Sequence, residues 1–142
     1  MSQTTSYPIT TSVSADVHAA IEDAARRADR DVASVAAEML TEAAKMRRVP
    51  GIVFADGVRG RVAQIAGSGL EVWEVVERYQ AVDESWELLR QEFEWLSESQ
   101  LRAALGYAEA YPKEIAERLQ ADERWTPETL YAAHPFMKPT GS

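Results

Sequence analysis

Hydrophobic and polar positions in the first third of the chain follow two different periods. Residues 9–13 alternate with a period of two, which predicts a short strand. Ser14 is a favourable N-cap, and the helical spacing of small and apolar residues after it predicts a first helix. Asp31 caps a second predicted helix, whose apolar stripe ends before the proline and glycine at 50–51. The predicted order is therefore strand, helix, helix.

Such a segment is too short to bury a core of its own, and a lone strand leaves an unpaired edge. Both problems disappear if two copies pair their strands and interlock their helices. In the order of alternating strand, small cap, helix, polar turn and second helix, residues 8–48 resemble the ribbon-helix-helix family of the Arc and MetJ type. The resemblance implies an intertwined homodimer through residues 8–48.

The same resemblance implies which residues would contact operator DNA. Outward strand side chains touch bases in that family, and here they are Thr10 and Ser12. The start of the second helix, with Asp31, Ala33 and Ser34, would present backbone amides to a phosphate. The strand lacks the Arg, Lys, Asn or Gln usual among the base readers, and hydroxyls discriminate bases less than a bidentate Arg or Asn. A module kept only for dimerisation is therefore an alternative.

After residue 50 the pattern changes to short β-like runs followed by helical periodicity. Runs at 52–54 and 62–65, separated by glycine-containing turns, predict a β-hairpin. Apolar spacing predicts helices over about 70–80 and around 86–93. The glycines at 67 and 69 are not followed by the Gly-Lys-Ser/Thr of a phosphate loop, so a tight turn explains them better.

The strongest local signal lies at the start of the next helix. Ser97 and Gln100 match a capping box, and Leu96 and Leu101 match its hydrophobic staple. Pro112 opens a further helix. The turn before Ser97 fits a helix-turn-helix corner, although packing within the domain or against a partner is the favoured role of the helix after it. If that helix read DNA, its outward residues would be Ser99, Gln100, Arg102, Ala103, Gly106 and Tyr107.

Residues 50–120 carry a second resemblance, to a bacterial family of unknown function that includes VapB-like antitoxins. It lies in the stretch from Gly51-Ile52-Val53-Phe54 to Val75-Val76, and in Trp95-Leu96-Ser97 through Pro112-Lys113-Glu114-Ile115. The resemblance implies a homeodomain-like helical fold, a PIN-type ribonuclease toxin as partner, and repression of the protein's own operon. The family's glycine turn usually continues with Thr-Arg, which Ser68-Gly69-Leu70 lacks.

Charge is distributed unevenly along the chain. The 142 residues contain 23 acidic and 15 basic side chains, a net charge of −8. Residues 1–50 hold seven of the acidic and six of the basic residues, so residues 51–142 carry a net charge of −7. This acidity opposes overall attraction to nucleic acid and suits a basic protein partner, or it serves only to keep the surface solvated.

Catalytic and metal-binding chemistry has little support in the sequence. There is no cysteine, and the two histidines lie far apart along the chain. Glutamate pairs such as Glu74 and Glu77 have no nearby nucleophile or metal ligand. No apolar run approaches the roughly 20 residues of a spanning helix, and the first residues are polar. We expect a cytoplasmic protein that is not an enzyme and needs no cofactor.

Aromatic and basic residues near the C-terminus provide candidate partner contacts. Three tryptophans (Trp73, Trp86 and Trp95) occupy apolar helix positions or helix starts, which predicts core packing, whereas Trp125 lies in the tail before a short predicted helix. A cation inserted into the acidic catalytic pocket of a PIN-type toxin would block metal binding there. The candidate toxin contacts are Arg118, Arg124, Trp125, Phe136 and Lys138.

The sequence thus predicts a mainly α protein with a ribbon-helix-helix module over 1–49, a hairpin and helix-turn-helix-like bundle over 50–121, and a tail over 122–142. The predicted function is that of an antitoxin-like dimeric regulator that binds operator DNA and neutralises a PIN-type toxin. Two alternatives are a stand-alone ribbon-helix-helix transcriptional regulator without a toxin and a dimeric adaptor that does not bind DNA.

Overall fold

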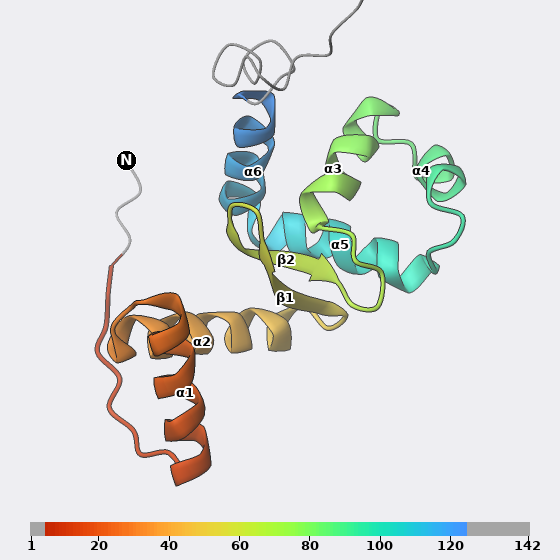
Figure 1. Ribbon diagram of the computed structural model, residues 1–142. Coiled ribbons are helices and arrows are strands. Elements are labelled where there is room, and N and C mark those ends of the chain that lie inside the picture. Colours follow the sequence, from red (N-terminus) through yellow and green to blue (C-terminus); the bar gives the residue numbers. More distant parts are fainter. Residues whose placement is uncertain (1–4, 125–142) are drawn as a thin grey trace, which may run out of the picture. The chain divides into compact units, whose positions relative to one another are not determined.

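The computed structural model describes residues 5–124, which form six α-helices and one two-stranded antiparallel hairpin (Figure 1). The prediction of a mainly helical protein with a small hairpin is confirmed. The chain divides into two compact units, one ending at Ala44 and the other beginning at Lys45. The boundary falls inside a helix, whose last turn belongs to the second unit.

The first unit contains α1 (Ala15–Ala28) and most of α2 (Val32–Arg48), and both predicted N-caps are confirmed. The Ser14 hydroxyl accepts a hydrogen bond from the Val17 backbone N–H at 3.4 Å. The Asp31 carboxylate accepts one from the Ser34 backbone N–H at 2.7 Å. Between the helices, Asp29 adopts a left-handed conformation with φ of 53°, which ends α1.

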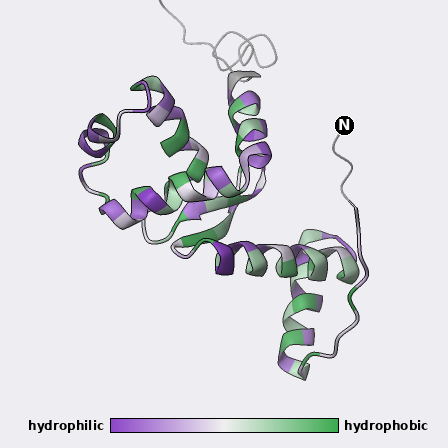
Figure 2. Cartoon of the chain, turned by 180° about the vertical axis from the view of Figure 1, so that it is seen from behind, coloured by the Kyte–Doolittle hydropathy of each residue, from purple (hydrophilic) through white to green (hydrophobic). Residues whose placement is uncertain are grey.

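The apolar residues of this unit are mostly exposed. Only Ala25 and Val35 are buried among its described residues. The side chain of Ile9 is 76 % exposed and that of Leu40 is 53 % exposed. Figure 2 shows hydrophobic residues along both helices. The other large apolar residues left exposed are Tyr7, Val13, Val17, Val32 and Met39.

The predicted strand over residues 9–13 is absent from the single chain, in which residues 5–14 form neither helix nor strand. The physical reason is that a strand requires a hydrogen-bonded neighbour, and none of the described residues pairs with this segment. The predicted neighbour is the same segment of a second copy. Pairing between two copies therefore stays a prediction.

The second unit begins with the hairpin that the sequence predicts. Strand β1 (Ile52–Gly57) pairs antiparallel with β2 (Gly60–Ile65), in a register that places Ile52 opposite Ile65. Gly51, just before β1, has φ of 95°, a conformation that favours glycine. A Cβ at this position would lie 3.3 Å from the Ala103 Cβ, so the chain also passes close to a later helix.

Four helices follow the hairpin: α3 (Val72–Ala81), α4 (Trp86–Glu92), α5 (Glu98–Ala110) and α6 (Pro112–Arg124). The hairpin packs on α5, and α3 packs on both α5 and α6. The buried core of the unit draws on all of these elements and on the residue after α2. It consists of Val49, Ile52, Ala63, Ile65, Val72, Val75, Val76, Leu89, Leu96, Leu101, Ala104, Tyr107 and Ile115.

Both local signals around the predicted capping box are confirmed. Ser97 and Gln100 exchange hydrogen bonds between side chain and backbone at 3.1 and 2.8 Å. Leu96 and Leu101 are both buried, as a hydrophobic staple requires. The Gln100 amide also donates to the Ala66 backbone carbonyl at 3.3 Å, which joins the start of α5 to the end of the hairpin.

Candidate functional site

The predicted DNA-contacting residues all lie on the surface of the first unit. Thr10 and Ser12 are exposed in the segment before α1, and Asp31, Ala33 and Ser34 are exposed at the start of α2. A ligand could therefore reach both the segment before α1 and the start of α2. No described residue of this set is basic.

The Asp31 carboxylate accepts the hydrogen bonds at the start of α2, where a phosphate was predicted to bind. The Ser34 backbone N–H and hydroxyl donate to the two Asp31 carboxylate oxygens at 2.7 and 2.9 Å. These two bonds lower the pKa of Asp31, so its carboxyl stays ionised at neutral pH. A phosphate at this helix start would have to displace the Asp31 carboxylate and overcome its negative charge.

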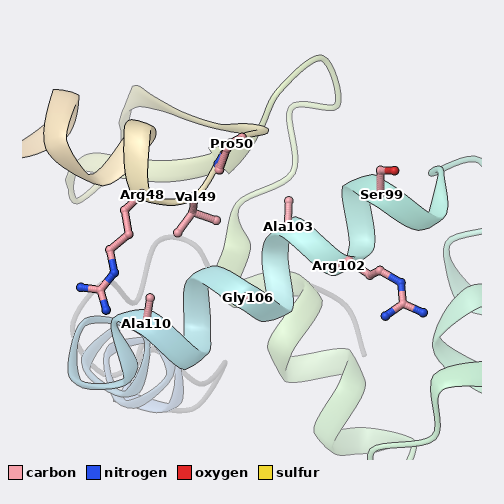
Figure 3. A pocket seen from close by; sticks show the side chains of 8 residues that line it. All are labelled: Arg48, Val49, Pro50, Ser99, Arg102, Ala103, Gly106 and Ala110. Atoms are coloured by element: carbon pink, nitrogen blue, oxygen red, sulfur yellow. The ribbon is translucent and has the colours of Figure 1, made fainter.

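One face of α5 borders an open groove of about 460 Å³ (Figure 3). Its helix side carries small residues, among them Ala103 and Gly106, and its other wall is the segment from Arg48 to Pro50. The only charged residues that line it are Arg48 and Arg102. Arg102 pairs with Glu98 at 2.8 Å, so its charge is partly neutralised.

The residues that line this groove test the hypothesis that α5 contacts DNA bases. Ser99, Arg102, Ala103 and Gly106 do line this face, as predicted for outward residues. The segment from Arg48 to Pro50 and the close approach of Gly51 to Ala103 crowd the same face. Packing within the unit therefore accounts for this helix face better than insertion into a DNA groove.

Two residues predicted to point outward on α5 point inward. Tyr107 is completely buried because its hydroxyl donates to the Glu114 carboxylate at 2.7 Å and its ring packs edge-on against Phe54. Gln100 is half-buried because its side chain completes the capping box. The prediction was wrong at these positions, since Tyr107 has an internal hydrogen-bond partner that sequence spacing does not reveal.

A charged network lies beside Tyr107. Lys45, in the last turn of α2, forms an ion pair with Glu114 of α6, and its ammonium lies 5.0 Å from the Tyr111 ring centroid. The Arg48 guanidinium lies 5.3 Å from the same ring. The end of α2 is thus held against α6 by the ion pair and against Tyr111, which follows α5, by two cation–π contacts.

Among the predicted toxin contacts, Arg118 is the one whose side chain is described. Its guanidinium donates to the Arg61 backbone carbonyl at 2.6 Å and to the Arg59 carbonyl at 3.5 Å. It therefore ties α6 to the hairpin. The side chain of Arg124, together with Trp125, Phe136 and Lys138, lies outside the described residues.

The acidic residues offer no metal centre within residues 5–124, where no group of three or more potential ligands comes together. Of the glutamate pairs considered for acid–base chemistry, Glu77 has a perturbed pKa. Desolvation and a hydrogen bond to the Asp122 carboxyl raise it. This contact joins α3 to α6, and no nucleophile accompanies it.

Trp95 is the surface residue that the sequence interpretation missed. The prediction of core packing holds for Trp73 and Trp86, which are half-buried against the core, but Trp95 is 61 % exposed. The sequence contained a partial signal, because Trp95 lies in the turn between two predicted helices rather than on an apolar helix face.

Comparison with known proteins bears on the second unit. Residues 52–108 match a family model described as "Protein of unknown function (DUF433)". This part of the chain is similar to the DUF433 family. The matched residues cover the hairpin, α3, α4 and most of α5. No ribbon-helix-helix or antitoxin family model matches the chain. No curated protein and no solved structure gives a significant match.

No helix in the described part of the chain combines the length and the apolar character needed to cross a bilayer.

Proposed function

We propose that this protein is an antitoxin-like dimeric regulator. Its first unit pairs with that of a second copy and contacts operator DNA. Its acidic second unit, with the residues that follow α6, binds and neutralises a PIN-type ribonuclease toxin. The observation that carries the proposal is the contrast between a first unit with an incomplete core and a second unit with a complete one.

The incomplete core supports dimerisation. A unit of about 40 residues with two buried side chains cannot balance the entropy of ordering its chain. A second copy would cover the exposed apolar residues of α1, α2 and the segment before them. This arrangement agrees with the resemblance of residues 8–48 to ribbon-helix-helix dimers.

The charge of the second unit supports a protein partner. Residues 51–142 carry a net charge of −7, which attracts a basic protein and repels DNA. Residues 50–120 resemble a family with VapB-like antitoxin members, and this resemblance indicates a PIN-type toxin as the partner. Because Arg118 is engaged by carbonyl groups of the hairpin, Arg124 and Lys138 are the preferred cations for a toxin pocket.

The first test of neutralisation is whether a PIN-type protein is encoded beside this gene, and the second is inhibition of that protein. The full chain is expected to abolish its ribonuclease activity at equal molar amounts, measured by cleavage of a labelled RNA. A shortened chain ending at Arg124 keeps α6 whole and is expected to inhibit more weakly, because it lacks Trp125, Phe136 and Lys138. If no PIN-type gene is adjacent, or the toxin stays fully active, the antitoxin proposal is wrong and the stand-alone regulator is favoured.

Operator binding is tested by replacing the predicted base-contacting hydroxyls. The double substitution Thr10→Ala with Ser12→Ala is expected to reduce the preference for the protein's own promoter over random DNA, measured by competition footprinting. The matched control is Thr5→Ala with Ser6→Ala, which removes the same groups just before the predicted strand. The parent is expected to bind weakly alone and more tightly with its toxin, because the net charge of −8 on each chain opposes DNA.

A dimeric adaptor without DNA binding is the second candidate. The observation that favours it is the Asp31 carboxylate at the start of α2, where a phosphate contact would be expected. Equal footprints from the parent and the Thr10/Ser12 variant would decide for this alternative.

A further inference from the structure

An exposed tryptophan lies in the turn between α4 and α5. Trp95 is 61 % exposed, and its ring meets Phe93 edge-on at 6.5 Å between centroids. Leu88, on α4, is also exposed. Tryptophans placed in this way are the residues most often found at the energetic centres of protein interfaces.

The same stretch concentrates the negative charge of the unit. Residues 82–99, named here the acidic corner, hold six acidic residues and one basic residue, a net charge of −5. Glu92 pairs with Arg78 and Glu98 pairs with Arg102. The remaining acidic residues are exposed and form no ion pair within the described part of the chain: Asp83, Glu84, Glu87 and Glu94.

The acidic corner is held in place before any partner arrives. The Glu84 backbone N–H donates to the Tyr79 carbonyl at 2.8 Å, which fixes the turn after α3. Ser85 caps α4 through the Leu88 backbone N–H at 3.3 Å, and the capping box at Ser97 fixes the start of α5. Figure 1 shows α4 at the outer edge of its unit, in the connection between α3 and α5. A preorganised surface loses little conformational entropy on binding.

We infer that the acidic corner is a docking surface for a basic region of the partner toxin, with Trp95 as its apolar anchor. The inference rests on the proposed function, which supplies the toxin, and it adds a contact site separate from the residues that follow α6. The negative charge of the acidic corner favours a basic region of the toxin as its binding partner. Nucleic acid and anionic lipid are repelled by a net charge of −5, and so is the acidic corner of a second copy.

The experiment measures binding of the adjacent PIN-type toxin, in a catalytically inactive form, to the full chain by calorimetry. Trp95→Ala is expected to weaken the affinity by about thirtyfold, as removal of an interface hot spot does. The control Val58→Ala alters a fully exposed apolar residue at the hairpin turn and is expected to leave the affinity unchanged. Circular dichroism of each variant checks that the fold is intact.

The charge component is measured separately by association kinetics. The pair Glu87→Gln with Glu94→Gln is expected to slow association at low salt and to flatten its salt dependence. Glu117→Gln, an exposed charge on α6, provides the control.

Three results would contradict the proposed docking surface, and each has a different meaning. If the parent binds the toxin and Trp95→Ala binds equally well, the docking surface is wrong and the proposed function stands. If the parent does not bind the toxin, the proposed function fails and the inference fails with it. If Trp95→Ala changes the oligomeric state of the protein alone, in light scattering, the corner is a self-association surface instead.

Discussion

Leu101→Ala is expected to lower the free energy of unfolding of the second unit by about 2–5 kcal/mol, because it leaves a cavity in a close-packed core. Leu101 is buried on α5, within the cluster that the hairpin, α3 and α6 share. It is also one half of the hydrophobic staple that holds the start of α5. The loss is measured by urea unfolding followed by tryptophan fluorescence. Residues 1–44 contain no tryptophan, so the signal does not report unfolding of the first unit.

The control for this prediction is Leu88→Ala, the same change at an exposed position on α4. It removes the same atoms without opening a buried cavity and is expected to change the unfolding midpoint little. Equal effects of the two substitutions would mean that the core is not centred on α5.

Thr11→Pro is expected to prevent the proposed dimer from forming and to leave the first unit unfolded. Proline removes the backbone N–H that strand pairing between two copies would use, and it is poorly tolerated within a ribbon of two strands. Without that pairing, the buried pair Ala25 and Val35 is too small a core to hold α1 and α2 together. Light scattering gives the oligomeric state, and far-ultraviolet circular dichroism gives the loss of helix.

Thr11→Val keeps the backbone N–H and has a high strand propensity, so this control is expected to remain a dimer. A parent protein that is monomeric and fully helical at micromolar concentration would contradict the prediction. In that case the exposed apolar residues of the first unit would need another explanation.

Local sequence signals predicted helix starts in both units and the hairpin of the second unit. The caps at Ser14, Asp31 and Ser97 and the glycine turns predict the helix starts and the hairpin, because each depends on residues within one turn of chain. The turn reading of residues 67–69 also agrees with the structure, where the Ser68 hydroxyl bonds the Ile65 carbonyl and the Leu70 N–H.

Features that depend on distant residues were missed. Tyr107 points inward because Glu114 and Phe54 meet it there, and these contacts cross three elements. Arg118 is engaged because the hairpin presents two backbone carbonyls to α6. The groove beside α5 likewise depends on the passage of Gly51 near Ala103, which spacing along the chain does not encode.

The placement of Lys45 and Val49 sets the limits of the smallest fragment that can be expected to fold. Val49 and Ile115 belong to the buried core, and Lys45 and Glu114 form an ion pair, yet all four lie outside the residues that match DUF433. A fragment cut at 52 and 108 would expose apolar core surface at both ends. Recombinant production of the isolated domain should therefore begin at Lys45 and extend through α6, and relatives of this chain should be compared over that longer span.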